Sequence, residues 1–92
     1  YKDDILVGQS ITFLFAGFET SSTTMAFALW ELAKNTVIQE RLRQEIFEEL
    51  KINGLTYESV RRMTYLMKVI NEVMRLYPAV PIIDRVANED YK

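Results

Sequence analysis

The sequence predicts a mainly α-helical chain with one long central helix, three shorter helices and a short β segment. Apolar residues recur at helical spacing over most of the chain before residue 78. Pro78 and Pro81 are the only prolines, so no proline interrupts a helix before them. Threonines, the usual side chains of a helix start, precede each of the three shorter helical patterns. A chain of 92 residues has room for one small domain with a modest core.

The long helix is expected over residues 3–34, where the apolar pattern is continuous. Such a helix would be roughly 45 Å long. A helix that is apolar over much of its circumference is typical of the centre of a larger protein. Phe27, Trp30 and the four methionines are expected to pack in the core. The most apolar window, residues 5–18, is too short to span a bilayer and runs into Glu19.

The second helix is expected over residues 37–51. Thr36 and Gln39 have the spacing of a capping box at its start, and an Asn-Gly pair follows its end. The third helix is expected over residues 57–63, with Thr56 as its cap.

The fourth helix is expected over residues 65–77, with Thr64 as its cap and Pro78 as its stop. Its apolar stripe consists of Leu66, Ile70, Val73 and Tyr77. Residues 82–87, within "PIIDRVA", have the composition of a short strand.

Composition excludes several classes of function for this chain. The net charge is −2 and the basic residues are dispersed, so no nucleic-acid partner is expected. Cysteine and histidine are absent, which excludes disulfides, zinc sites with thiolate or imidazole ligands, and Cys or His nucleophiles within these residues. The sequence begins inside a helical pattern and ends after a strand-like one, so we expect an internal fragment of a longer protein.

The stretch "AGFETSSTT" places polar side chains within the apolar long helix. Gly17 costs about 1 kcal/mol relative to alanine in a helix, but it lets a flat ligand lie close to the backbone. The Thr20 hydroxyl can bond to the Ala16 carbonyl and bend or widen the helix, and Glu19 could relay protons. The alternative is that the small and hydroxyl residues only permit tight helix packing, with Glu19 at the surface.

Two arginines near the end of the chain are also candidates. Glu72 and Arg75 share a helix face in an apolar context, which favours a buried bidentate pair. Similar Glu-x-x-Arg patterns that begin at Glu40 and Glu58 are expected to be surface pairs. Arg85 follows an apolar segment; it either pairs with the neighbouring aspartate or faces water, or its guanidinium binds an anionic cofactor group.

"AGFETSS", followed by "EVMRLYP" and then "PIIDRVA", resembles the cytochrome P450 superfamily of haem-thiolate monooxygenases. Over essentially the whole chain the amino-acid sequence is most similar to insect microsomal members that metabolise toxins and insecticides. The resemblance implies that residues 1–92 are a partial cytochrome P450 domain, part of a larger α-rich fold. It also implies that this fragment alone is inactive.

The resemblance implies roles for individual residues of the long helix. Ala16 and Gly17 would line the oxygen pocket and contact the cofactor. Thr20 would hydrogen-bond the dioxygen, Glu19 would belong to the proton-delivery path, and Phe13 could touch substrate.

Further along the chain, Glu72 and Arg75 would be the structural pair of the haem-binding core, and Arg85 would meet a haem propionate. One departure is Thr36, which stands where many relatives have a proline. The family's cysteine ligand would lie beyond residue 92, so this chain would contain no ligand of the metal.

The resemblance implies that the full-length protein binds haem, an iron protoporphyrin. It would insert one oxygen atom from O2 into lipophilic substrates such as xenobiotics, insecticides, endogenous lipids or hormones. Electrons from NADPH would arrive through a reductase. The endoplasmic reticulum (microsomal) membrane would be contacted through an N-terminal segment. The alternative is a non-enzymatic helical packing or interaction module, which would explain the absence of cysteine directly.

Overall fold

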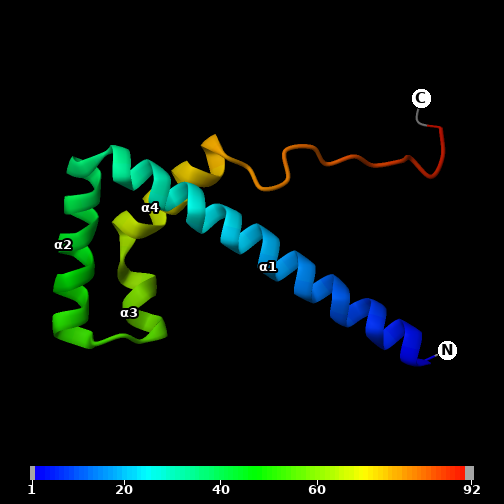
Figure 1. The fold of residues 1–92 in the computed structure, drawn as a ribbon, viewed down its shortest axis with the longest axis horizontal. Helices are drawn as coiled ribbons and strands as arrows, with labels where there is room; N and C mark the ends of the chain where they lie inside the picture. The colour runs from blue at the N-terminus through cyan, green and yellow to red at the C-terminus, as the bar shows by residue number, and fades with distance from the viewer. Residues whose placement is uncertain (1, 91–92) are drawn as a thin grey trace.

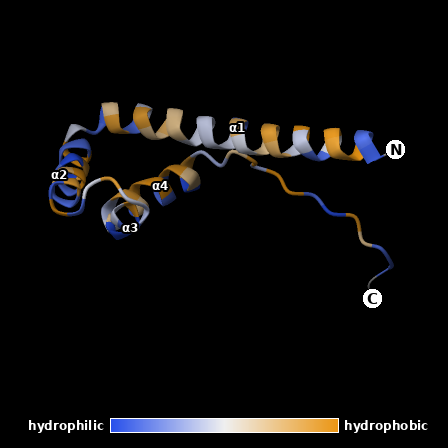
Figure 2. Cartoon of the chain, turned by 90° about the horizontal axis from the view of Figure 1, so that it is seen from below, coloured by the Kyte–Doolittle hydropathy of each residue, from blue (hydrophilic) through white to orange (hydrophobic). Residues whose placement is uncertain are grey.

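The computed structural model describes residues 2–90 and confirms the mainly α prediction (Figure 1). Its helices within these residues are α1 (Lys2–Lys34), α2 (Thr36–Asn53), α3 (Tyr57–Arg62) and α4 (Thr64–Leu76). The long helix and the three shorter ones therefore lie in the expected order. Figures 1 and 2 both show the first half of α1 extending away from the other three helices.

Helix α1 is an unbroken α-helix of 33 residues with no buried side chain. The expected widening between Gly17 and Thr20 is wrong, because the backbone stays α-helical there. The Thr20 hydroxyl does bond to the Ala16 carbonyl, at 2.5 Å, but it does so without opening a turn. None of the helices in residues 2–90 combines the length and apolar character needed to cross a membrane.

The core is small and lies where α4 meets α1 and α2. Leu42, Met63 and Val73 are its buried apolar side chains, each at most 5% exposed. The expectation that Phe27, Trp30 and the four methionines pack in the core is wrong for all but Met63, which is buried, whereas Phe27 is 37% exposed and Trp30 is 60% exposed. The apolar stripe of α4 does face inward, because its four members are buried or half-buried.

Helix α2 does not begin with the expected capping box. Thr36 is already helical, and Asn35 precedes it without a side-chain cap hydrogen bond. The Gln39 amide donates instead to the Leu32 carbonyl of α1, at 3.2 Å. The Gln39 side chain therefore links α2 to α1 and does not cap the start of α2.

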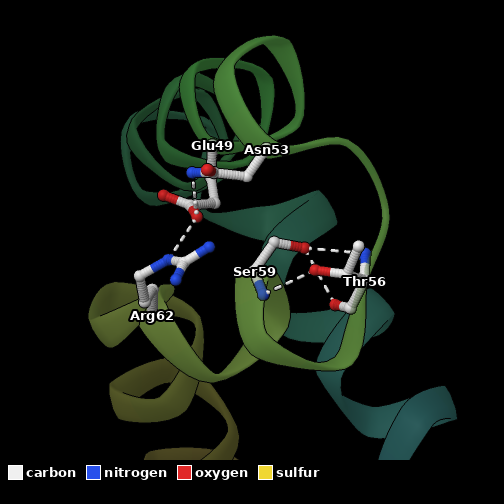
Figure 3. A network of polar contacts seen from close by, with 5 residues as sticks. All are labelled: Glu49, Asn53, Thr56, Ser59 and Arg62. Carbon is white, nitrogen blue, oxygen red and sulfur yellow. Dashed lines mark hydrogen bonds and ion pairs between the residues drawn. The ribbon is translucent and has the colours of Figure 1, made fainter.

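Helix α3 begins as predicted, with Thr56 as its cap (Figure 3). The Thr56 hydroxyl accepts from the Ser59 backbone N–H, and the Ser59 hydroxyl oxygen accepts from the Thr56 backbone N–H. Ser59 is fully buried. Next to this box, Arg62 donates to Glu49 of α2 at 2.8 Å, and Asn53 donates to the same carboxylate at 2.8 Å. This network fixes α3 against α2.

Helix α4 is capped by a residue from another helix. Thr64 is its first residue and not its cap, so that expectation is wrong. The Glu45 carboxylate of α2 accepts from the backbone N–H groups of Tyr65 and Leu66, both at 2.9 Å. An anionic side chain is favourable at the positive end of a helix, so Glu45 stabilises both the start of α4 and its angle to α2.

The segment after α4 contains no strand within the described residues, so the expected strand at 82–87 is wrong for this chain. The large apolar side chains of residues 82–86 are exposed, from 72% for Ile83 to 92% for Val86. A strand needs a neighbouring strand to bond its backbone N–H and C=O groups. The described residues provide no such neighbour, and the segment runs away from α4 in both views (Figures 1 and 2).

Candidate functional site

The predicted site residues of α1 gather on one side of the helix, with one exception. At about 100° of rotation per residue, the positions at steps of three, four and seven fall within an arc of about 100°. That arc holds Phe13, Ala16, Gly17 and Thr20, which all lie in α1. Glu19 lies about 100° from Thr20 around the helix and is exposed to solvent. The carboxylate therefore lies beside the open face, about 60° from Ala16, rather than within it.

The face around Gly17 is open and its polar groups are satisfied. A methyl group built on Gly17 would meet no atom within 4 Å. The Ala16 carbonyl accepts from the Thr20 hydroxyl, and the Gly17 carbonyl accepts from the Ser21 hydroxyl. Phe13, one turn away, is 77% exposed. A flat apolar group can therefore approach the α1 backbone here, with the half-buried Thr20 hydroxyl at one edge.

A groove of about 560 Å³ opens beside Thr20. Its walls come from α1, from Ile70 and Met74 of α4, and from residues 78–80, which follow α4. The lining is mostly apolar, so the groove suits a lipophilic occupant. The sequence does not reveal the contribution of residues 78–80, because Pro78 indicates only where a helix stops.

Tyr77 joins the end of α4 to α1. Its ring stacks in parallel on Phe27 with the ring centroids 4.3 Å apart. Its hydroxyl donates to Glu31 at 2.6 Å, and Lys34 approaches the same carboxylate at 3.1 Å. The hydrogen bond from Tyr77, then that from Lys34, lowers the pKa of Glu31, and the bond to Glu31 raises the pKa of Tyr77. Tyr77 was expected on the inner stripe of its helix, but its partners were not foreseen.

Glu72 and Arg75 form the bidentate pair that the sequence predicts. The Arg75 guanidinium donates to the two carboxylate oxygens at 2.8 and 2.6 Å. The hydrogen bond lowers the pKa of Glu72 and raises the pKa of Arg75. The expected burial is wrong within this chain, since the side chains are 55% and 66% exposed. The pair is therefore a solvent-exposed charged pair on α4.

Three further arginines, two from the other Glu-x-x-Arg patterns and Arg85, differ in their partners. The expected surface pair between Glu40 and Arg43 forms. Arg61, which was expected to pair with Glu58, lies over the Tyr57 ring with its guanidinium carbon 5.8 Å from the ring centroid. Arg85 is exposed and donates to the Asp84 backbone carbonyl at 2.7 Å.

Comparison with known proteins identifies the class to which this arrangement belongs. The sequence model of the family described as "Cytochrome P450" matches residues 1–92. The chain is 51% identical over 89 residues to cytochrome P450 6a9 and 52% identical over 88 residues to cytochrome P450 6a2, both from Drosophila melanogaster. It is 50% identical over 88 residues to cytochrome P450 6l1 of Blattella germanica. No solved structure matches the chain.

These alignments cover 94–95% of this chain and 17–18% of the length of each relative. The chain belongs to the cytochrome P450 family. Its four helices, within the described residues, fit a mainly α part of that family's fold. The relatives to which it is similar include insect proteins.

Proposed function

We propose that the full-length protein is a haem-dependent monooxygenase that inserts one oxygen atom from O2 into lipophilic substrates such as xenobiotics, insecticides, endogenous lipids or hormones. Residues 1–92 would be a partial domain of it. NADPH would supply electrons through a reductase, at the endoplasmic reticulum membrane. The observation that carries the proposal is the open apolar face of α1, with the Thr20 hydroxyl between Gly17 and a lipophilic groove.

The residues present fit a flat, largely apolar cofactor. The space above Gly17 is open, and the carbonyls of Ala16 and Gly17 already accept from hydroxyls, so an apolar ring there would leave neither carbonyl unpaired. The exposed Arg85 guanidinium suits an anionic substituent such as a propionate. Haem, when bound, supplies the activation of O2, and we place its cysteine ligand beyond residue 92.

Thr20 would hold and pass a proton at its hydroxyl oxygen. This hydroxyl donates to the Ala16 carbonyl, which leaves the oxygen lone pairs to accept a bond from water. Glu19, exposed on the neighbouring side of α1, would take protons from solvent and pass them to that water. The apolar groove wall and Phe13 would hold the substrate and exclude bulk water.

Replacement of Thr20 in the full-length enzyme tests this proposal. Thr20→Ala removes the hydroxyl, so we expect more hydrogen peroxide and less product per NADPH consumed. Thr20→Ser should restore much of the coupling, because it keeps a hydroxyl.

A matched control for the helix itself is Thr12→Ala. Thr12 makes the same kind of bond, to the Gly8 carbonyl at 2.9 Å, earlier in α1. This variant should couple NADPH to product as the wild type does. Unchanged coupling in Thr20→Ala would remove Thr20 from proton delivery.

The exposed apolar side chains of α1 favour a second candidate, a helical module that packs against another protein without catalysis. The full-length protein separates the two candidates. Purification with haem and a thiolate-type carbon monoxide difference spectrum would support the enzyme. A folded protein that takes up no haem would support the packing module.

A further inference from the structure

We propose that Tyr77, through its contacts with Phe27 and Glu31, positions residues 78–80 and so sets the width of the groove beside Thr20. Tyr77 would thereby decide which breadth of lipophilic ligand reaches the open face of α1. This inference rests on the proposed function, since it concerns the ligand space of the same site. Tyr77 acts as a positioning residue and touches no reacting atom.

The two contacts of Tyr77 restrain it in different directions. Parallel stacking on Phe27, with centroids 4.3 Å apart, fixes the plane of the ring. The hydrogen bond to Glu31, at 2.6 Å, fixes the direction in which the ring points. The Tyr77 backbone N–H also donates to the Val73 carbonyl at 2.8 Å. The residue is therefore fastened to α1 by its side chain and to α4 by its backbone.

The segment directly after Tyr77 has little other support. Residues 78–80 belong to no helix or strand, and they form one wall of the groove opposite Thr20 and Thr24 of α1. Pro78 comes directly after Tyr77, and its ring restricts the backbone torsions on both sides of that junction. A shift of Tyr77 would therefore be passed on to Ala79 and Val80 and would widen or close the groove.

Glu31 is itself held in place by two further side chains, so the hydrogen bond from Tyr77 has a fixed acceptor. Lys34 bonds to its carboxylate at 3.1 Å, and the Asn35 amide reaches it at 3.4 Å. A hydrogen bond from a phenol to an ionised carboxylate is stronger than one between neutral groups. Thermal motion of α4 against α1 is thus opposed at the point where the groove wall begins.

The test uses full-length haem-loaded protein and two azoles that bind at the haem iron, the slender 1-butylimidazole and the broad clotrimazole. The readout is the ratio of their dissociation constants, measured from the shift of the haem absorption band. Tyr77→Leu removes both contacts and should change this ratio several-fold. Tyr77→Phe keeps the stack and should give a smaller change in the same direction. Glu31→Gln keeps an acceptor and should stay near the wild-type ratio.

The control is Glu40→Gln, because Glu40 pairs with Arg43 of its own helix, away from the groove. It should leave the ratio unchanged. If Tyr77→Leu takes up no haem, Phe27→Leu and Tyr77→Phe, which each remove one contact, decide the question. An unchanged ratio in variants that bind haem and both azoles would overturn the positioning role and leave the proposed function standing. A wild-type protein without haem would instead overturn the proposed function.

Discussion

At the scale of single residues, Glu31 is the most connected side chain in the candidate site. It accepts from Tyr77 at 2.6 Å, from Lys34 at 3.1 Å and from Asn35 at 3.4 Å. The Tyr77 bond is the main reason why the pKa of Glu31 lies below its usual 4.5 and the pKa of Tyr77 above its usual 10.0. At neutral pH both groups therefore stay in the forms that bond to each other.

These shifts predict a pH dependence of stability. Below pH 4.5 the unfolded chain protonates Glu31 more readily than the folded chain does, so stability falls as the pH falls through the lowered pKa. The contribution is fully present above 4.5. Urea midpoints of the full-length protein and its Glu31→Gln variant measure it. Their difference should be largest above pH 4.5 and shrink below it; a constant difference would contradict the role of the charge.

Tyr77 sets the limit of the same contact at alkaline pH. Its raised pKa means that the contact is intact below 10.0 and is lost as the pH rises through the higher folded value. Tyr77→Phe has no phenol to ionise and should not show this alkaline loss.

Thr20 shows which residue-level features the sequence can predict. Its bond to the Ala16 carbonyl follows from the four-residue spacing alone, as do the bonds of Ser10 and Thr12 to carbonyls four residues earlier. The expected widening of the helix was wrong because such a bond fits a regular α-helix as well as a distorted one. The exposure of Glu72 and Arg75 was missed because an apolar helix face does not reveal what covers it.

At the scale of elements, the two short connections around α3 use different means to start a helix. Helix α3 is closed by its own residues, through Thr56 and Ser59. Helix α4 is closed by Glu45, which lies on α2 about twenty positions earlier. Because one carboxylate of α2 accepts from two backbone N–H groups of α4, the crossing of α2 and α4 is set at the point where α4 begins.

Removal of this cap should have a local and a global effect. Glu45→Ala in the full-length protein should lower the free energy of unfolding by roughly 1 kcal/mol, as other N-terminal caps do. Hydrogen exchange at the backbone amides of Tyr65 and Leu66 should quicken, since both donate to Glu45. Glu48→Ala, an exposed glutamate on the same helix, is the control. Equal exchange rates in wild type and Glu45→Ala would show that the cap contributes nothing.

The contrast also explains which element boundaries the sequence could predict. The Thr56 cap depends on residues three apart and was foreseen, whereas the Glu45 cap depends on how two helices cross and was not. The strand expected at 82–87 failed for a related reason. Strand composition expresses a preference, but a strand forms only beside a partner, and none lies within the described residues.

At the scale of the whole molecule, the chain is much more open than a self-contained domain. Its radius of gyration is 18.8 Å, whereas a compact domain of this length would have about 12 Å. Its accessible surface is 8429 Å², against about 5,500 Å² for a compact folded protein of this mass. The family could be recognised from ordered motifs along the sequence, whereas the exposure of the apolar side chains of α1 follows from packing that the motifs do not describe.

The 92-residue chain by itself should therefore be partly folded. We expect a helical circular dichroism spectrum, a broad thermal transition and strong binding of a hydrophobic dye, because α1 has no buried side chain. Leu42→Ala should remove much of the helical signal, since loss of a buried leucine costs about 2–5 kcal/mol and the core has few members. Val86→Ala, at a side chain 92% exposed, should leave the spectrum unchanged. A sharp transition without dye binding would mean that the four helices stabilise one another far better than their small shared core implies.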